Sequence, residues 1–432
     1  MSRKVAILFL SFALAVTLLS VSAQPTNAAL SLTMWHMEQP PHRVKRVQEL
    51  LDEWNAANPD IQIRQEVQNW GEIYTKAPLA AQAGGLPDIM FGIPDFTTVL
   101  LGTDAVKPVT GLVKELDAKH KFVSAAVEPY SYNGEIWAVP LYGMVHSLWY
   151  NKAMFAEAGL EAPKTWDDLL AAAEKLHDPE NGVYGIGLPA NKQLYTDQVL
   201  YNIMLTAGAS ELFNEDGSIA FENPATVKAF EAYKALWQFS PPDSVSWTWG
   251  EAEAALASGT VPMIFQFTVI TTWEQQSGMD ADMLGVTAIP VSAEGMEGAI
   301  YYSNAALLTT ADPERQAAAA KFLSWLLEPE NYGRFLNMEP GLFLPVTADG
   351  ATADSFWNDP LTIKYRSQVE TMVENTKRGA LFGFTKGRVF QAIGAISAQN
   401  LLSAALQRML IDGLSPADAV KWGQEQMTAA TR

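Results

Sequence analysis

The chain has 432 residues, of which 48% are hydrophobic, and its 29 basic and 48 acidic side chains give a formal net charge of −19. This acidity argues against nucleic acid or an anionic membrane surface as a partner, because like charges repel. The chain contains no cysteine, which excludes disulfides, cysteine nucleophiles, cysteine metal ligands and a lipid-acceptor cysteine.

The N-terminal segment has the pattern of a secretory signal. Arg3 and Lys4 precede an uncharged apolar run over residues 5–19, and Val21-Ser22-Ala23 offers a signal-peptidase site, with a second site near Ala28. A transmembrane anchor is the alternative, but a spanning helix needs about 20 apolar residues. We therefore expect cleavage of a signal peptide that ends at residue 23 or as late as residue 28. The expected product is a periplasmic protein without membrane insertion.

The first hundred residues after this segment predict alternating strands and helices. Apolar residues recur with a period of two in the strands and of 3.6 in the helices. The predicted elements are strands at 30–34, 61–67 and 86–91 and helices at 42–58 and 74–83. This order predicts a mostly parallel sheet covered by helices, whose ligand site lies beyond the carboxyl ends of the strands. Those ends are residues 35–39, 69–70 and 94–96.

The rest of the chain continues the α/β pattern. Asn133-Gly134 predicts a hairpin turn, and Pro140 is expected to interrupt the ladder that follows it. Thr165 and Asp168 form a capping-box pattern at the start of another helix. Further expectations are strands at 147–150, 183–188, 259–267, 285–290 and 305–310, helices before residue 257 and at 313–327, and a largely helical chain from residue 360.

Catalytic signatures are absent from the sequence. It contains no GxxxxGK[ST], GxSxG or HExxH motif, and Gly182, Gly185 and Gly187 do not have the spacing of a dinucleotide fingerprint. The five histidines show no metal-ligand spacing, so we expect neither a metal nor a cofactor. A pair of glycosidase carboxylates cannot be selected from 48 acids. We therefore expect a binding protein rather than an enzyme, with a secreted glycosidase as the distant alternative.

A series of short segments carries a family resemblance along nearly the whole chain after the signal. The segments are Trp35 after the first strand, 50–59, 84–89, 132–140, 148–152, 163–169, 254–259 with Met263, 318–323 and 413–416. In this order they resemble the extracellular solute-binding proteins of ABC importers, in the group that contains the maltose-binding protein. The resemblance implies a carbohydrate ligand, from a monosaccharide to an oligosaccharide or a sugar conjugate, and a transient complex with the permease of an ABC importer.

The resemblance also implies the fold and the mechanism. Two α/β lobes of the type II periplasmic binding-protein fold would be joined at a hinge, and the monomer would close around the ligand in the cleft. The first lobe would comprise residues 30–141 and 303–342, and the second residues 142–302 and 343–432. The chain would cross between the lobes near Pro140-Leu141, Tyr301-Tyr302 and 341–345.

Candidate ligand contacts combine aromatic rings with polar groups. A sugar ring has apolar C–H faces that stack on aromatic rings, and hydroxyl groups that bond to carboxylates, amides and guanidinium groups. The positions carried over are Trp35, His36, Glu38, Trp70, Asp95, Phe96, Tyr142, Met144, Tyr195, Gln266, Phe267, Tyr301, Tyr302 and Arg388.

Several alternatives stay open at these positions. Met144 stands where the maltose-binding protein has a glutamate, which puts maltose itself in doubt. Asp95 could instead cap a helix, and Arg388 could instead form a surface salt bridge. The same fold could also bind a phosphorylated polyol or another anionic conjugate, because Arg388, His36 and a helix amino end could accommodate a negative charge.

Overall fold

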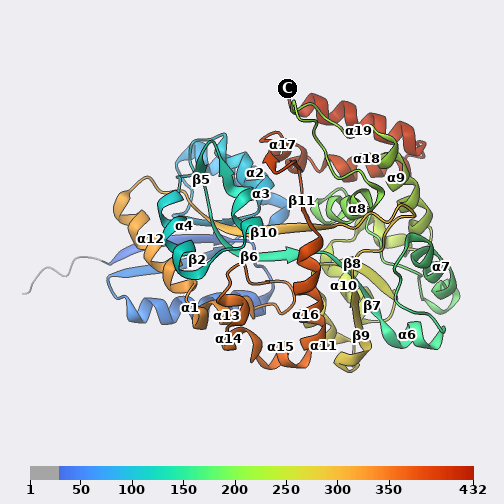
Figure 1. The fold of residues 1–432 in the computed structure, drawn as a ribbon, viewed down its shortest axis with the longest axis horizontal. Coiled ribbons are helices and arrows are strands. Elements are labelled where there is room, and N and C mark those ends of the chain that lie inside the picture. Colours follow the sequence, from blue (N-terminus) through green and yellow to red (C-terminus); the bar gives the residue numbers. More distant parts are fainter. Residues whose placement is uncertain (1–28) are drawn as a thin grey trace, which may run out of the picture.

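A computed structural model describes residues 29–432, so the predicted signal segment lies outside the described residues. Figure 1 shows two α/β lobes side by side, with the N-terminal half of the first lobe in blue and cyan and the second lobe mainly in green and yellow. This arrangement confirms the predicted two-lobed fold. Within residues 29–432 no helix is long and apolar enough to cross a bilayer.

The sheet of the first lobe has six strands. They are β1 (Leu30–His36), β2 (Ile61–Val67), β3 (Ile89–Gly92), β6 (Val139–Val145), β10 (Ala299–Leu308) and β11 (Gly379–Leu381). Strand β1 lies between β2 and β3 and is parallel to both, whereas β10 runs antiparallel to β3 and β6. The sheet is therefore mixed, because β10 enters it from the second lobe and not through a βαβ crossover.

Helices cover both faces of this sheet. They are α1 (Pro41–Ala57), α2 (Trp70–Ala83), α3 (Pro94–Leu101), α4 (Thr110–His120), α5 (Ser124–Val127), α12 (Pro313–Leu326), α13 (Pro329–Leu336) and α14 (Asp354–Trp357). The 3.6-residue period predicts one apolar face on α1, formed by Val44, Val47, Leu50, Leu51 and Trp54; the last four are buried and Val44 is half-buried. Trp54 packs edge-on against Phe322 of α12, with 5.4 Å between ring centroids.

The second lobe is built around a three-stranded antiparallel sheet. Strand β7 (Ser147–Asn151) lies between β8 (Met263–Gln266) and β9 (Leu284–Thr287). Its helices are α6 (Lys152–Glu157), α7 (Trp166–Leu176), α8 (Leu194–Ala207), α9 (Pro224–Trp237), α10 (Trp249–Ala257), α11 (Ile270–Gln276), α16 (Arg366–Asn375), α18 (Leu401–Leu410) and α19 (Pro416–Ala430). The capping box at the start of α7 is confirmed by reciprocal bonds between Thr165 and Asp168.

Small elements complete the fold. They are the hairpin of β4 (Ser131–Tyr132) and β5 (Glu135–Ile136), the hairpin of β12 (Phe384–Thr385) and β13 (Arg388–Val389), and the helices α15 (Pro360–Lys364) and α17 (Ile393–Ala398). The predicted turn at Asn133-Gly134 is confirmed, and both residues have positive φ. Helix α17 packs against α3, so this C-terminal helix touches the first lobe.

Three predictions about strands need correction. Pro140 does not end the ladder but lies inside β6, where it pairs with Ala305 of β10. The register of the β6–β10 pair shifts between Asn304 and Ala305, and such a bulge accommodates a residue without an N–H donor. Residues 183–188 form only isolated bridges at Val183 and Gly187, not a strand. The strand predicted at 305–310 begins six residues earlier in β10, because tertiary pairing with β6 extends it.

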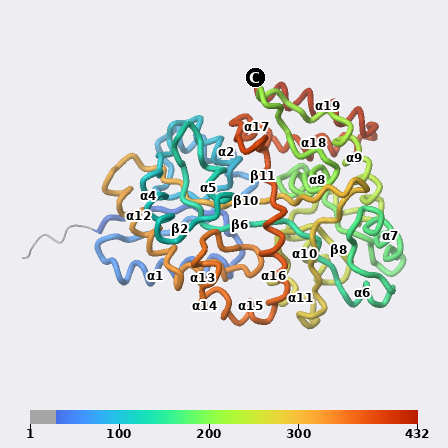
Figure 2. Tube along the Cα trace, viewed as in Figure 1, coloured from blue at the N-terminus to red at the C-terminus, as the bar shows by residue number. Residues whose placement is uncertain are grey.

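Two paired strands, β6 and β10, run between the sheet of the first lobe and the second lobe. Strand β6 leads from the first sheet towards β7, and β10 returns from the second lobe (Figure 2). Farther along the chain, Thr347 still pairs with Phe122, and the carboxylate of Asp349 lies 2.7 Å from the ring of His120. Beyond that point, Lys364 of α15 bonds to Glu274 of α11, and α16 packs against β9 of the second lobe.

Candidate functional site

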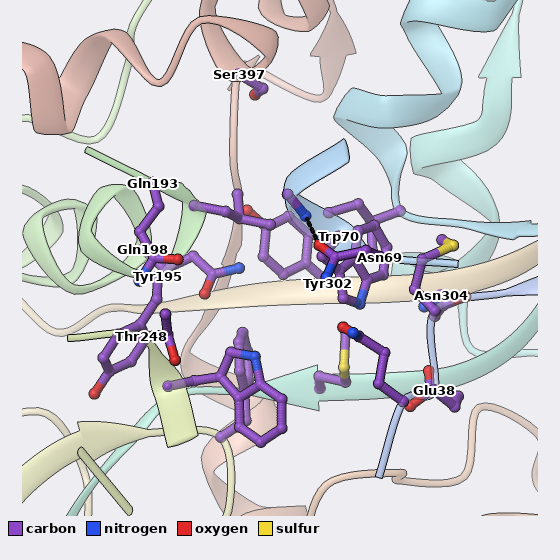
Figure 3. A pocket seen from close by; sticks show the side chains of 18 of the residues that line it. Glu38, Asn69, Trp70, Gln193, Tyr195, Gln198, Thr248, Tyr302, Asn304 and Ser397 are labelled. Atoms are coloured by element: carbon purple, nitrogen blue, oxygen red, sulfur yellow. Dashed lines mark hydrogen bonds between the residues drawn. The ribbon is translucent and has the colours of Figure 1, made fainter. Parts of the chain in front are cut away.

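A cavity of about 440 Å³ lies between the lobes and is lined by side chains from both (Figure 3). The first lobe contributes Glu38 and Trp70, which follow the carboxyl ends of β1 and β2. The second lobe contributes Tyr195, at the first turn of α8, and Gln266, at the end of β8. This placement agrees with the general rule that ligands bind at the carboxyl ends of strands in α/β sheets.

Half of the predicted contact residues line this cavity. They are Glu38, Trp70, Met144, Tyr195, Gln266, Phe267 and Tyr302. The structure therefore brings together residues that lie up to 264 positions apart, although their contact with a ligand stays a prediction. The other half lie outside the lining: Trp35, His36, Asp95, Phe96, Tyr142, Tyr301 and Arg388.

Trp35 and His36, at the end of β1, bond to the neighbouring strand. The Trp35 indole donates to the Glu66 carboxylate at 2.7 Å, and the His36 ring lies 2.7 Å from the Gln65 side-chain oxygen. Burial lowers the pKa of His36, so this ring stays neutral at physiological pH. Both side chains therefore support the sheet beside the cavity.

Asp95, Phe96 and Tyr142 lie one layer behind the lining. The Tyr74 hydroxyl donates to Asp95 at 2.7 Å, and the Tyr74 ring packs edge-on against Phe96 at 5.2 Å. The Tyr142 hydroxyl donates to the Glu38 carboxylate at 2.7 Å. Because Tyr74 and Glu38 line the cavity, these three residues are placed to orient lining side chains.

Tyr301 and Arg388 lie farther from the cavity. Tyr301 precedes Tyr302 on β10 and packs against Gly143, on the opposite side of the strand from the cavity. Arg388 is an exposed residue in the hairpin of β12 and β13, and its guanidinium donates to the backbone oxygen of Glu215 at 2.6 Å.

Several lining residues are not among the contacts predicted from the sequence. They include Arg43, Tyr74, Gln198, Glu253, Asn304 and Ser397. Asn304 could have been found from strand alternation, because it lies two residues after Tyr302 on the same face of β10. The others come from helices whose orientation only the tertiary structure defines.

Four buried polar atoms, on residues that line the cavity, make no hydrogen bond within residues 29–432. They are Gln266 Nε2, Tyr302 Oη, Asn304 Oδ1 and Ser397 Oγ, on side chains that are at most 3% exposed. Tyr302 Oη lies near the Gln198 side chain and Ser397 Oγ near Asp95, but neither pair has the geometry of a hydrogen bond. The Gln266 amide is oriented, since its Oε1 accepts from the Phe267 N–H at 2.7 Å and leaves Nε2 as a free donor. An unpaired buried polar group costs about 1–3 kcal/mol. Groups of this kind at a cavity therefore indicate a ligand that bonds to them.

Aromatic rings line the same cavity. Trp70 and Phe267 come from opposite lobes, and Trp249 and Phe343 lie near the guanidinium of Arg43, with centroids 5.9 and 5.4 Å from its Cζ. Apolar ring faces beside unpaired donors and acceptors suit a ligand that has both C–H faces and hydroxyl groups.

Comparisons with known proteins agree with this geometry. Residues 41–333 match the family described as bacterial extracellular solute-binding protein. YcjN of Escherichia coli (strain K12), which carries the name of an ABC transporter periplasmic-binding protein, is 27% identical over 94% of both chains. The maltotriose-binding protein of Pyrococcus abyssi is 24% identical over 83% of this chain and 76% of its own.

A solved structure shows the same fold. It is an ABC transporter solute-binding protein of Thermotoga lettingae bound to α-D-tagatose, with a TM-score of 0.79 and 22% identity over 94% of this chain and 100% of that one. The family match spans more than half of the chain and includes strands and helices of both lobes. The chain therefore belongs to the bacterial extracellular solute-binding proteins.

Proposed function

We propose that this protein captures an uncharged carbohydrate or polyol between its lobes and presents it to the permease of an ABC importer. The four unpaired polar atoms at the wall of an aromatic-lined cavity carry this proposal. They include a donor on Gln266, an acceptor on Asn304 and hydroxyl groups on Tyr302 and Ser397. Hydroxyl groups of a sugar can donate and accept, so they can satisfy all four.

The size of the cavity supports a small ligand. Its volume of about 440 Å³ lies within the range of about 300–1,000 Å³ that is typical of small-molecule pockets. This space suits one or two sugar rings better than a long oligosaccharide. The relatives support the same chemistry, since one is named for maltotriose and another is bound to α-D-tagatose.

The charges at the cavity favour an uncharged ligand over a phosphorylated or other anionic one. Arg43 is the buried cation of the lining, and its guanidinium already binds Glu38 at 3.1 Å and Glu339 at 2.7 Å. Lys192 also lines the cavity but is exposed. An anionic group would therefore meet the carboxylate of Glu38 without an uncommitted buried cation to balance it.

Capture would proceed by closure of the lobes about their links. We place two links along β6 and β10, near the expected crossings. The contacts of Thr347 and Asp349 with the first lobe support a third link after α14, later than the expected crossing at 341–345. The first lobe would then be residues 30–141, 303–342 and the following segment up to about α14.

The proposed setting is the periplasm. After removal of the signal, the protein would diffuse as a monomer, bind its ligand without chemical conversion, and engage the permease transiently. Turnover of any neutral sugar by the purified protein would contradict this assignment and favour a glycosidase.

A thermal-shift and calorimetric screen tests the assignment. The panel contains neutral sugars and polyols, including D-tagatose and maltotriose, together with matched sugar phosphates and uronic acids. A neutral ligand at 100 times its Kd should raise the free energy of unfolding by about 2.7 kcal/mol. Binding of sugar phosphates alone would overturn the choice of an uncharged ligand, and no binding across the panel would overturn the carbohydrate assignment.

Two matched variants localise the site. Tyr302→Phe removes one unpaired hydroxyl group, so it should weaken binding while leaving stability unchanged or higher. Tyr184→Phe removes a hydroxyl group outside the cavity lining and should bind as the wild type does. Equal affinity of the two variants would show that the cavity is not the ligand site.

A further inference from the structure

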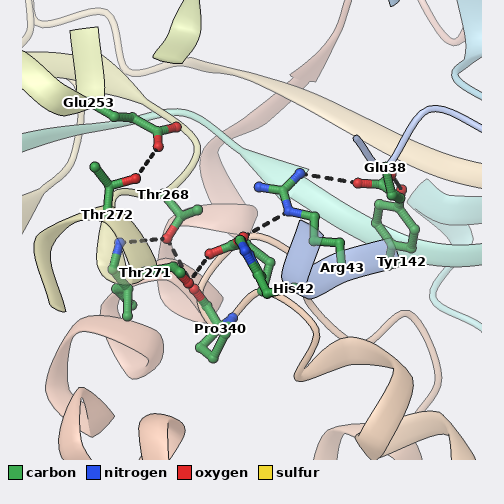
Figure 4. Close-up of polar contacts among 11 residues, drawn as sticks. Glu38, His42, Arg43, Tyr142, Glu253, Thr268, Thr271, Thr272 and Pro340 are labelled. Carbon is green, nitrogen blue, oxygen red and sulfur yellow. Dashed lines mark hydrogen bonds and ion pairs between the residues drawn. The ribbon is translucent and has the colours of Figure 1, made fainter. Parts of the chain in front are cut away.

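A continuous set of polar contacts joins the two lobes beside the cavity (Figure 4). Arg43, in the first turn of α1, donates through Nη1 to Glu38 at 3.1 Å and through Nε to Glu339 at 2.7 Å. Glu339 follows α13 in the first lobe, and its other oxygen accepts a hydrogen bond from the hydroxyl group of Thr271, on α11 of the second lobe. Glu339 therefore contacts both lobes.

The carboxylate at the centre of this set is charged and well supported. The Glu339 side chain is 3% exposed, and His42 lies 2.6 Å from the same oxygen that Arg43 contacts. Burial alone would raise the pKa of Glu339, but the Arg43 guanidinium and His42 outweigh it and lower the pKa. Thr271 therefore donates to an ionised group, a stronger hydrogen bond than one between neutral groups.

The loop after Glu339 adds a close contact between the lobes. The Thr268 hydroxyl group donates to the backbone oxygen of Pro340 at 3.0 Å. Gly341 has a φ of +78°, and a Cβ atom there would lie 2.9 Å from the Ile270 side chain. Glycine therefore allows this loop to reach the start of α11.

We propose that Arg43, Glu339 and Thr271 form an interlobe tie that stabilises the closed arrangement and thereby sets ligand affinity. This inference rests on the proposed function, because it requires closure to accompany binding. Glu339 and Thr271 lie outside the cavity lining, so they act as positioning residues. A larger closed fraction raises the apparent affinity, since the apparent Kd is the intrinsic Kd divided by the binding-competent fraction.

The decisive variant is Thr271→Val, which keeps the shape of the side chain and removes the hydroxyl donor. The matched control is Thr385→Val. Thr385 is fully buried and donates to the backbone oxygen of Phe213 at 2.8 Å, within the second lobe. Both variants lose one buried hydrogen bond, but only the first loses a bond between the lobes.

Spin labels can report closure directly, because the chain has no native cysteine. Leu79→Cys on α2 and Ile411→Cys after α18 place labels at positions that are 59% and 54% exposed, on opposite lobes. Double electron–electron resonance then measures the distance between the labels, without ligand and with D-tagatose or maltotriose. Urea unfolding of each variant measures its global stability.

Without ligand, Thr271→Val should move the distance distribution towards longer distances, whereas Thr385→Val should match the wild type. Calorimetry uses D-tagatose or maltotriose, whichever binds the wild type. The Kd of Thr271→Val should be about tenfold higher than that of the wild type, which corresponds to a loss of about 1.4 kcal/mol of binding free energy. Identical distance distributions in the wild type and Thr271→Val would overturn the tie. If neither sugar nor any other panel member binds, the proposed function fails, while the ligand-free distances still decide the tie.

Discussion

The substitution Glu253→Gln should remove a measurable part of the pH dependence of folding stability. Glu253 lies on α10, is 7% exposed, and accepts a hydrogen bond from the Thr272 hydroxyl at 2.6 Å. Burial, together with the negative charge of Glu339, raises the pKa of Glu253 to about 8, although Thr272 and Arg43 act in the opposite direction. Its carboxyl group is therefore mainly protonated in the folded protein at pH 7.

The sign of the effect follows from the two protonation states. The Glu253 carboxyl group titrates near 4.5 in the unfolded chain and near 8 in the folded protein. Between these values the folded state binds more protons, so stability falls as the pH rises. The contribution is fully present below pH 4.5 and is lost as the pH rises through 8. Each pH unit inside this window lowers the free energy of unfolding by about 1.4 kcal/mol, so the Glu253 carboxyl group lowers it by about 3 kcal/mol between pH 5 and pH 7.

Urea unfolding at pH 5, 7 and 8.5, followed by tryptophan fluorescence, measures this contribution. Relative to the wild type, Glu253→Gln should become progressively more stable as the pH rises, because glutamine has no proton to lose. Glu231→Gln, at an exposed position on α9, makes the same chemical change and should leave the pH dependence unchanged. If the wild type and Glu253→Gln differ in free energy of unfolding by the same amount from pH 5 to pH 8.5, the reasoning is refuted.

Three further predictions concern stability and can be measured by urea unfolding at pH 7. Asp88→Asn should lower the free energy of unfolding by about 2 kcal/mol, because hydrogen bonds to charged groups contribute about 1.5–3 kcal/mol. Asp88 is 5% exposed and binds Arg315 through two bonds of 2.6 Å. A loss smaller than that for an exposed ion pair would contradict this prediction. Thr165→Ala should cost about 1 kcal/mol by removing the N-cap of α7, with partial rescue by Ser but not by Val. Gly185→Ala should prevent stable folding, since its Cβ would lie 1.9 Å from a backbone oxygen of α7, whereas Gly111→Ala on α4 meets nothing within 4 Å and should be tolerated.

Much of the fold follows from local patterns in the sequence. The strand at 61–67, the apolar face of α1 and the capping box of α7 agree with the structure because each depends on residues close together in the chain. The order of many weak segments also identified the family and its two-lobed fold. The prediction of a strand at 183–188 was wrong, because pairing with a distant partner decides whether an extended segment joins a sheet.

The lining of the interlobe cavity depends on tertiary contacts as well as on chain order. Chain order placed Glu38 and Trp70 correctly beside it, since both follow strands of one sheet. Trp35 precedes Glu38 by only three residues but bonds to Glu66 on the neighbouring strand. Local sequence could not predict which of the two side chains would line the cavity, because side-chain direction at a strand end depends on the neighbouring strands.

By itself, the sequence determined the absence of cysteine chemistry, the α/β pattern, the family and some of the segments that border the interlobe cavity. Only the tertiary structure decided which side chains remain unpaired at the cavity wall and which ones join the lobes. Arg43 illustrates the difference: its charge is evident in the sequence, but its commitment to Glu38 and Glu339 depends on residues 5 and 296 positions away. Whether a charged group binds a ligand or a neighbouring side chain depends on such distant contacts, which local spacing does not encode.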